Sequence, residues 1–329
     1  MISQSIRFHT FGKAEEVTQL EPVRLPDLQS GEVLVRMLVT PINPADLNFI
    51  QGNYGVRPEL PDSPGIEGCG EVLESQAEGF EVGDKVIFIE RVGTWQSHIV
   101  CDARKVLRIP SQIAPEQAAM LKVNPATAWR VLKGFEQLEA GDWVIQNAAN
   151  SGVGQCLIQI AKQMGLHTIN VVRRDGLEES LKALGGDHVL IDDAELVEKV
   201  RAICGEKLPR LASNAVGGDS ALRQMDALGE YGTQVTFGAM SMRSLKVPNK
   251  FLIFKGISLR GLWITKWLAA APREEVQQVY DQLAAWVIEG KLEQSIDTLY
   301  PPEKVSEALV HAQQGERGGK VLIDWRALA

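Results

Sequence analysis

The sequence predicts a two-domain α/β protein, in which a barrel-type β domain is combined with a doubly wound parallel-sheet domain. Three observations support this fold class. The length of 329 residues suits two domains of roughly 150 residues each. Short strands interrupted by Gly and Pro fill the chain up to about residue 115. Beyond that point, strand patterns alternate with helix patterns.

The first part contains strand patterns bounded by turn signals. Residues 32–39 form an apolar, β-branched run, and 85–89 form a second one directly after the turn signal Gly83-Asp84. Short strands with this punctuation are typical of barrel-like sheets. We therefore expect an all-β first domain.

The second part reads as a repeated strand–helix unit. Strands are expected at 143–146, 168–172, 189–191, 211–214 and 234–237, with helices at 152–164, 177–184 and 196–204 between them. Alternation of this kind requires a parallel sheet with right-handed crossovers. The order therefore predicts a doubly wound domain of the dinucleotide-binding type.

The C-terminal part contains two helix patterns, 273–289 and 302–314, followed by a last strand at 320–324. We expect that strand to rejoin the first domain. The predicted domains are therefore 1–119 together with 266–329, and 120–265.

Composition and charge exclude several classes of protein. The chain has 34 Lys and Arg against 42 Asp and Glu, a net charge of −8, which argues against a nucleic-acid partner. No apolar run approaches the roughly 20 residues of a membrane span, and the first residues lack the apolar core of a signal peptide. Four widely spaced cysteines favour buried thiols over a zinc knuckle or disulfides. We therefore expect a cytoplasmic protein.

The connection after the strand at 143–146 is the main candidate for a phosphate-binding loop. Where dinucleotide-binding folds have Gly-x-Gly-x-x-Gly, this chain has Ala149-x-Ser151-x-x-Gly154, with Gly152 added. Small residues between a strand and a helix let a pyrophosphate approach the backbone amides at the helix N-terminus. The alternative is a tight turn that binds nothing.

The end of the next strand points to the cofactor. NAD-binding folds place an acid there against the ribose hydroxyl, whereas this chain has Arg173 and Arg174. A guanidinium can hold a 2′-phosphate through charge-assisted hydrogen bonds. We therefore predict NADPH as the cofactor. The alternative is a solvated basic pair beside Asp175.

Taken together, these segments resemble the medium-chain dehydrogenase/reductase superfamily. Its zinc alcohol dehydrogenases bind a catalytic zinc through a Cys, a His and a second Cys. In this chain Asn43 and Ile66 stand at the first two positions, and no thiol lies near Val123. The resemblance therefore implies no bound metal.

Without a metal, the expected reaction is hydride transfer to an acceptor that conjugation already polarises, and this reaction needs a proton donor. Tyr54 lies in a turn framed by Gly52 and Gly55 and is a candidate. A tyrosine on a surface turn is the alternative.

A closer resemblance is to the zinc-free, mitochondrial-type trans-2-enoyl-CoA (enoyl thioester) reductases of that superfamily. It is carried by the segments 43–48, 50–55, 58–61, 93–95, 123–127, 144–155, 169–173, 214–218, 251–254 and 259–263. The resemblance implies a GroES-like barrel-type domain and a Rossmann domain, with Tyr54 as the proton donor. It also implies a homodimer.

The same resemblance implies a set of cofactor-binding residues. Asn124 and Thr127 would lie at the nicotinamide, and Lys320 would reach the cofactor from the last strand. The pyrophosphate and adenosine phosphate would contact Asn150, Ser151, Gly152, Val153, Arg173, Arg174 and Asp175, and two further segments would line the cofactor, Phe237, Gly238, Ala239 and Met240, and Leu262, Trp263, Ile264 and Thr265. Trp263 lies in an apolar run, so packing in the core is an equal alternative for it.

Three functions remain to be separated. The leading hypothesis is an NADPH-dependent reductase of the carbon–carbon double bond of enoyl thioesters. A zinc-free quinone or enone reductase would need the same hydride but less help from a proton donor. A protein that binds NADPH without catalysis is the third.

Overall fold

The computed structural model describes residues 1–328, which divide into two compact units. Unit 1 comprises residues 1–123 and the segment from Thr265 onwards, and unit 2 comprises Asn124–Ile264. The first boundary lies at 123/124 instead of the expected 119/120, because helix α4 (Asn124–Gly134) packs on helix α5 (Gly152–Gln163) of unit 2. The second boundary differs by one residue from the expected 265/266.

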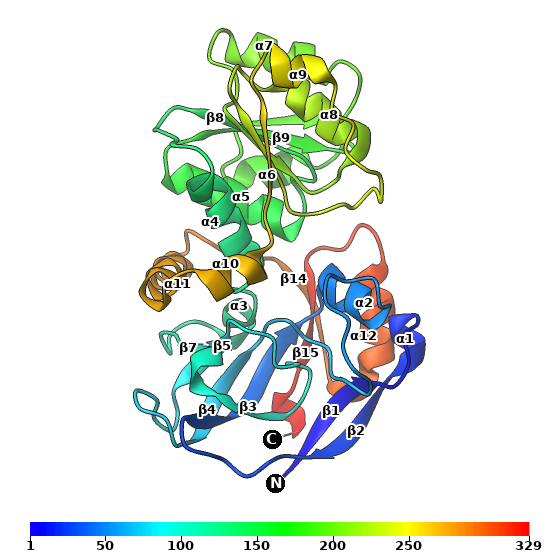
Figure 1. Ribbon diagram of the computed structural model, residues 1–329, viewed down its shortest axis with the longest axis vertical. Helices are drawn as coiled ribbons and strands as arrows, with labels where there is room; N and C mark the ends of the chain where they lie inside the picture. Colours follow the sequence, from blue (N-terminus) through cyan, green and yellow to red (C-terminus); the bar gives the residue numbers. More distant parts are fainter. Residues whose placement is uncertain (329) are drawn as a thin grey trace. The chain divides into compact units, whose positions relative to one another are not determined.

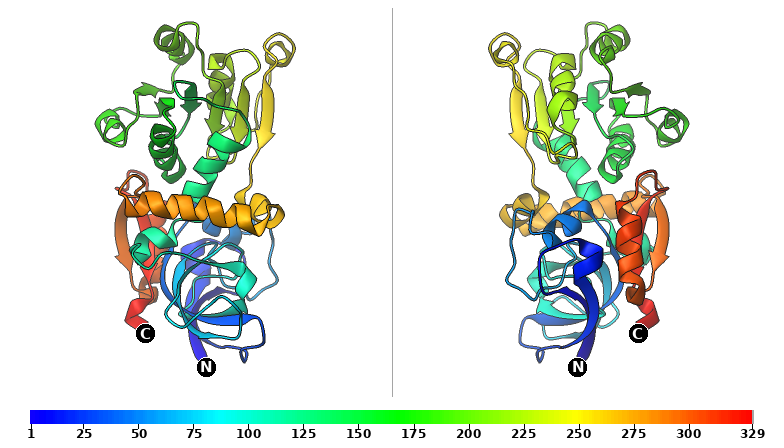
Figure 2. Two further views of the ribbon diagram at one scale, coloured as in Figure 1. Left: turned by 90° about the vertical axis from the view of Figure 1, so that its left-hand side faces the viewer. Right: turned by 90° about the vertical axis from the view of Figure 1, so that its right-hand side faces the viewer.

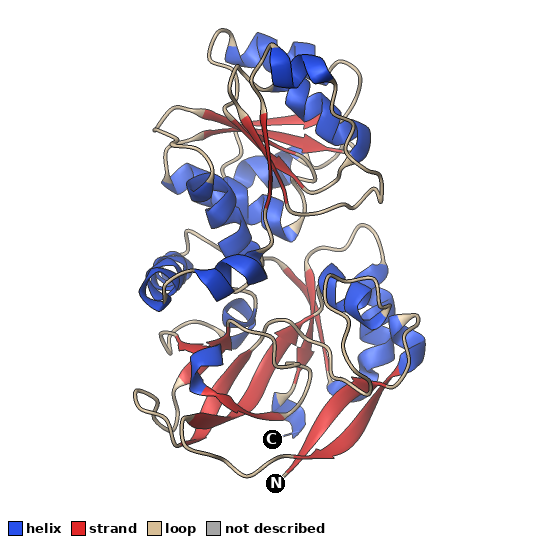
Figure 3. Ribbon diagram, viewed as in Figure 1, coloured by secondary structure: helices blue, strands red, loops and turns tan. Residues whose placement is uncertain are grey.

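Unit 1 is built around a mostly antiparallel seven-stranded sheet (Figure 1; Figure 3). The strand order is β14-β15-β3-β4-β5-β7, with β6 also paired to β3, and β1 and β2 form a separate hairpin. The strands of these two sheets of unit 1 are β1 (Ile2–Phe8), β2 (Thr18–Arg24), β3 (Glu32–Pro41), β4 (Cys69–Ser75), β5 (Lys85–Phe88), β6 (His98–Asp102), β7 (Val106–Arg108), β14 (Ile296–Tyr300) and β15 (Lys320–Asp324).

The expected last strand is β15, which lies between β14 and β3. It runs antiparallel to β3, with Leu322 opposite Pro41, and parallel to β14. Val321 and Ile323 point into the same core as Val35 and Met37 of β3. The two ends of the chain therefore share one sheet.

Helices pack against several strands of unit 1, and the sequence pattern predicted only some of them. They are α1 (Ala14–Val17), α2 (Pro44–Ile50), α3 (Pro115–Ala119), α10 (Ile264–Ala270), α11 (Arg273–Ile288) and α12 (Val305–Gln313). The helix pattern at 302–314 begins with a 3₁₀ turn, Pro302–Lys304, before α12. The short α1 and α3 were not predicted, because four or five residues are too few to show a helical period.

Unit 2 has six parallel strands in the order β10-β9-β8-β11-β12-β13, the doubly wound arrangement that the alternating pattern predicts. The strands are β8 (Trp143–Gln146), β9 (His167–Val172), β10 (His188–Ile191), β11 (Leu211–Asn214), β12 (Thr233–Thr236) and β13 (Ser258–Gly261), and besides α4 and α5 the helices are α6 (Glu178–Ala183), α7 (Leu196–Cys204), α8 (Gly218–Ala227) and α9 (Asn249–Ile253).

The sheet of unit 2 carries helices on both faces (Figure 2). Val171 packs in a core cluster with α7 and α8, while its neighbour Val172 packs in a second cluster with α5 and α6. Successive residues of a strand point to opposite faces, so two apolar faces must both be covered. The predicted α/β fold class is confirmed by this architecture.

Candidate functional site

The predicted phosphate loop joins β8 to α5 in unit 2. Its close packing depends on Gly154, because a Cβ there would lie 2.5 Å from the carbonyl oxygen of Ala149. Ser151 is the N-cap of α5 and accepts a hydrogen bond from the Gly154 amide at 3.2 Å. Asn150 and Gly152 are exposed, while Ser151 and Val153 are half-buried. The N-terminus of α5 is thus capped but open to a ligand.

The loop is anchored at its base by the buried amide of Asn147. Its Nδ2 donates to the Asn214 Oδ1 and the Ser220 Oγ, each at 2.9 Å, and its Oδ1 accepts from the Ala215 amide at 2.8 Å. These bonds join the ends of β8 and β11, which are neighbours where the order of the strands reverses. Sequence reasoning did not single out Asn147 or Asn214. Both are polar residues at the end of a buried strand, and this position in the sequence could have identified them as candidates.

Asn124 and Thr127 are buried in the first turn of α4. A Cβ on Gly152 would overlap the Asn124 side-chain amide, so α4 and α5 begin against each other. Two of the predicted segments, 124–127 and 150–153, are therefore brought together.

The other predicted residues of unit 2 follow the carboxyl ends of three strands of the same parallel sheet. Arg173, Arg174 and Asp175 come directly after β9, Phe237–Met240 come after β12, and Leu262 and Trp263 come after β13. Carboxyl ends of parallel strands meet at one edge of the sheet, which is the usual place of a ligand in such folds. The structure thus collects these segments at the same edge as the α5 N-terminus.

Exposure within this set is uneven. Arg173, Asp175, Ala239 and Met240 are exposed, whereas Arg174, Phe237, Gly238, Leu262 and Trp263 are half-buried. Ile264 is buried and ends unit 2, and Thr265 begins unit 1. Leu262 is fixed by its amide, which donates to the Thr236 carbonyl at 2.9 Å.

Tyr54 belongs to unit 1, in the turn that follows α2. The Gly52 amide donates to the Phe49 carbonyl at 3.1 Å, and the Asn53 amide donates to the Asn48 carbonyl at 2.8 Å. Gly52 has φ +76°, which favours glycine. The half-buried Tyr54 packs against the core of unit 1. It is therefore part of an ordered turn and is not a fully exposed surface tyrosine.

Lys320 lies at the start of β15, and its ammonium donates to the Asn43 Oδ1 at 2.5 Å within unit 1. Around Asn43 lie Asp46, Glu67 and Lys122, all almost completely buried. Burial raises the pKa of Asp46 to about 7 and lowers the pKa of Lys122 to about 8. Sequence reasoning missed this polar cluster. Its contact to Asn43 also gives Lys320 a partner that was not predicted.

The cysteines and the residue types that usually bind metals form no further candidate site within the described residues. All four cysteines lie in the described chain, are buried and form no disulfide, and burial raises the pKa of the Cys69 and Cys101 thiols to about 12. Within residues 1–328, no three His, Cys, Asp or Glu side chains are grouped so as to hold a metal ion. That a metal plays no part stays a prediction.

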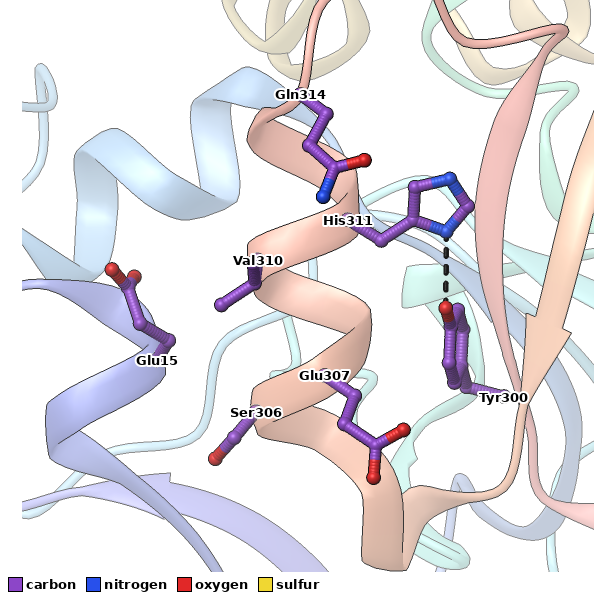
Figure 4. A pocket seen from close by; sticks show the side chains of 7 residues that line it. All are labelled: Glu15, Tyr300, Ser306, Glu307, Val310, His311 and Gln314. Atoms are coloured by element: carbon purple, nitrogen blue, oxygen red, sulfur yellow. Dashed lines mark hydrogen bonds between the residues drawn. The ribbon is translucent and has the colours of Figure 1, made fainter.

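A surface hollow in unit 1 contains none of the predicted residues. It is lined by Glu15, Tyr300, Ser306, Glu307, Val310, His311 and Gln314 (Figure 4). The Tyr300 hydroxyl and His311 Nδ1 share a hydrogen bond of 3.1 Å there.

Of the helices in the described part of the chain, none combines the length and apolarity that a membrane span needs.

Comparisons with known proteins place these features in a family. The model of the alcohol dehydrogenase GroES-like domain matches residues 29–111, and that of the zinc-binding dehydrogenases matches 152–285. The mitochondrial enoyl-[acyl-carrier-protein] reductase of Xenopus tropicalis is 38% identical over 324 residues, covering 95% of this chain and 93% of the relative.

Two solved structures extend the comparison. Etr1p, an enoyl thioester reductase known from Candida tropicalis, was solved with NADP and crotonyl-CoA; it is 28% identical, with TM-score 0.89 over 98% of this chain and 100% of that one. A Bacillus thuringiensis structure, provisionally named an NADPH:quinone reductase, is also 28% identical, with TM-score 0.92 over 98% and 99%.

One sequence-based expectation is wrong by these comparisons. The chain was expected to be cytoplasmic, but the enoyl reductases of Rattus norvegicus, Xenopus tropicalis and Homo sapiens that it resembles are all named mitochondrial. The expectation relied on cysteine usage and on the first residues, neither of which distinguishes one reducing compartment from another.

Identity over nearly the whole length, on the matching two-domain fold, shows that the chain belongs to the enoyl-[acyl-carrier-protein] reductase family of the medium-chain dehydrogenase/reductase superfamily.

Proposed function

We propose that this protein is an NADPH-dependent reductase of the carbon–carbon double bond of trans-2-enoyl thioesters, on CoA or an acyl carrier protein. The observation that carries the proposal is the edge of the unit 2 sheet. There the open N-terminus of α5 and the pair Arg173-Arg174 follow adjacent strands, β8 and β9. Unit 2 would bind the cofactor, and unit 1 would supply Tyr54 to the substrate.

The residues at this edge fit a dinucleotide phosphate. Residues 148–152 are Ala, Ala, Asn, Ser and Gly, so the loop itself contributes no long side chain at the start of α5. A helix leaves its first amides without intrahelical partners, and these amides with the positive end of the dipole suit a pyrophosphate. We assign this role to Asn150, Ser151, Gly152 and Val153.

The preference for NADPH over NADH rests on charge. The residues after β9 begin with two guanidinium groups, and Arg173 is exposed to solvent. Such groups bind a 2′-phosphate strongly, whereas a ribose hydroxyl is best held by an acid. Asp175 is two residues further along, and we assign it with the two arginines to the adenosine end. Phe237–Met240, Leu262–Thr265 and Lys320 would complete the cofactor site, and Asn124 and Thr127 would orient the nicotinamide.

The chemistry that NADPH supplies when bound is a hydride for the β-carbon of the enoyl group. The chain's own task is to complete the reduction. As the carbon–carbon π bond breaks, charge develops on the thioester as an enolate. The Tyr54 hydroxyl gives its proton to the α-carbon, a new C–H bond forms there, and water returns a proton to the phenolate. A tyrosine in an ordered, half-buried turn suits this role.

The alternative acceptor is a quinone, as the provisional name of the Bacillus thuringiensis structure suggests for that protein. Reduction of a quinone leaves the charge on oxygen, which water can protonate directly. Tyr54 then has no necessary task. The dependence of each reaction on Tyr54 therefore separates the two functions.

We further propose that the protein is a homodimer that pairs through β13. Within the described chain, β13 is an edge strand of unit 2, bonded to β12 on one side. Beside it, α9 and the following residue expose Ile253 and Phe254, at 70% and 78% of their surface. An open edge with exposed apolar side chains is a common site of association.

Replacing Tyr54 with Phe removes the proposed proton donor and keeps the ring. With a crotonyl thioester and NADPH, we expect turnover to fall by about a hundredfold or more, since general acid catalysis contributes about that factor. NADPH binding and quinone turnover should change little. Tyr231→Phe, at a tyrosine that is 77% exposed in unit 2, is the control. Near-normal thioester reduction by Tyr54→Phe would contradict the assignment, and a wild-type protein that reduces quinones but no thioester would favour the alternative.

Replacing Gly152 with Ala places a methyl group on the Asn124 amide. Because one of the two must move, we expect the Kd for NADPH to rise by about tenfold, measured by fluorescence titration. Gly315→Ala, where the methyl group meets open space, should bind like the wild type. Unchanged affinity in Gly152→Ala would argue against a cofactor at this loop.

Replacing Arg173 with Ala tests the choice of cofactor. A charge-assisted hydrogen bond contributes about 1.5 kcal/mol or more, so NADPH should bind about tenfold more weakly. The affinity for NADH should stay the same. Arg201→Ala, at an exposed arginine of α7 in the same unit, should change neither affinity. An equal loss of affinity for both cofactors would show that Arg173 does not bind the 2′-phosphate.

Replacing Phe254 with Glu puts a charge on the proposed dimer face. Light scattering at micromolar concentration should show a dimer for the wild type and a monomer for the variant, because burying an unpaired carboxylate is costly. Val310→Glu, at an exposed valine of unit 1, should remain dimeric. A monomeric wild type would remove the proposal.

A further inference from the structure

Four residues of the polar cluster of unit 1, Asn43, Asp46, Glu67 and Lys122, have no assigned role in the proposed chemistry, yet they are almost fully buried. Asp46, Glu67 and Lys122 expose 3% of their surface or less, and Asn43 exposes 3%. Charged groups are seldom buried unless they are paired and hydrogen-bonded. Two carboxylates and two lysines, Lys122 and Lys320, balance in number. This arrangement needs a reason beyond filling the core.

Glu67 stands at the centre of the cluster. One carboxylate oxygen accepts from the Asn43 Nδ2 at 2.8 Å, and the other accepts from the Val123 amide at 2.8 Å. Because both oxygens face N–H donors, the ionised form fits these bonds, and a protonated oxygen would point its hydrogen at a donor. Burial raises the pKa of Glu67, and the Lys320 charge and these hydrogen bonds oppose that rise.

The first of these contacts fixes the start of α2. Asn43 is the N-cap of that helix, and its backbone N–H donates to the Asp46 carboxylate at 2.8 Å. The other Asp46 oxygen accepts from the Ile66 amide at 3.1 Å, next to Glu67 in the chain. Two bonds therefore connect the first turn of α2 to the segment 66–67. One joins the Asn43 side chain to Glu67, and the other joins the Asp46 side chain to the Ile66 backbone N–H.

The chain that leaves the end of α2 leads to Tyr54, the proposed proton donor. The helix is only seven residues long, its last residues Phe49 and Ile50 are buried, and Tyr54 follows four residues later in a hydrogen-bonded turn. A short helix held at its start and packed at its end passes a displacement of Asn43 on to Tyr54. The second contact of Glu67 is to Val123, which directly precedes Asn124, the residue proposed to orient the nicotinamide.

We propose that Glu67 is a positioning residue for the reduction, because its single carboxylate holds in register the two segments that lead to Tyr54 and to Asn124. This inference rests on the proposed function for the meaning of those two residues. Glu67 itself need not touch the substrate. Its role predicts a loss of turnover with little loss of cofactor affinity.

The isosteric change Glu67→Gln tests this role. The new amide group must point an N–H at either Val123 or Asn43, and both are donors. Rotating the Asn43 amide would only transfer the conflict to Lys320, which donates to the Asn43 Oδ1. We expect kcat to fall by about ten- to a hundredfold, the effect of a displacement of about 1 Å, while the KM and Kd for NADPH stay within about threefold.

The double variant Asn43→Asp with Glu67→Gln is the matched rescue. The new amide at position 67 would accept from the Val123 amide and donate to the new carboxylate at position 43. That carboxylate would also accept from Lys320, so every contact returns with the same total charge. An aspartate is also a good N-cap. We expect kcat within about fivefold of the wild type. Glu71→Gln, at a half-buried glutamate of β4 paired with Arg36, controls for the substitution itself.

Amide hydrogen exchange gives a readout that needs no turnover. Glu67→Gln should speed exchange at 44–54 and at 121–123, and the double variant should restore protection at both segments. If the wild type reduced no enoyl thioester, the proposed function would fail, while these exchange rates would still decide whether Glu67 holds the two segments.

The outcomes separate the alternatives. Wild-type kcat and exchange in Glu67→Gln would overturn the proposal, and so would a loss of kcat that Asn43→Asp does not rescue. If Glu67→Gln failed to fold, the double variant would still decide: activity near the wild type would support the proposal, and a folded but inactive protein would overturn it.

Discussion

The close approach of α5 to the end of β8 is the constraint on which the candidate site depends. A Cβ at Gly154 would lie 2.5 Å from the Ala149 carbonyl oxygen, so only glycine allows the helix to start this near the strand. The same packing brings the first turn of α5 against the Asn124 amide of α4. A longer or looser connection would turn the helix amides away from the edge where the segments after β9, β12 and β13 meet.

The buried side-chain amides of Gln146 and Asn147 connect neighbouring strands next to this edge of the unit 2 sheet. Asn147 joins β8 to β11, and Gln146 donates to the Asn170 Oδ1 at 2.8 Å across to β9. An apolar side chain in place of Asn147 would leave the backbone amide of Ala215 without its acceptor. Polar residues in otherwise apolar strands thus set the relative positions of three neighbouring strand ends. Because these buried bonds fix the strand ends, the residues of the loop at 148–152 can be small.

Local patterns account for most of what could be predicted. The alternation of strand and helix in unit 2 is carried by short-range periodicity, so the parallel sheet and the loop at 149–154 followed from the sequence. The helix α8 was missed because it begins at Gly218, a residue that usually ends a helix. The partner of Lys320 was missed for a different reason. Its contact to Asn43 joins residues at opposite ends of the chain, and no local pattern reports such a pair.

The cluster around Glu67 includes Asn43 and Ile66, the two positions at which the family resemblance places metal ligands in the zinc alcohol dehydrogenases. At Ile66 the backbone, and not the side chain, makes the polar contacts: its amide donates to Asp46 and its carbonyl accepts from the Lys122 ammonium. Asn43 lies between Glu67 and Lys320 and bonds to both. The ammonium groups of Lys320 and Lys122 thus lie beside the buried carboxyl groups of Asp46 and Glu67, and directional N–H bonds fix the loops. An ordered Tyr54 turn follows from the same bonds, because the helix that leads to it begins at Asn43.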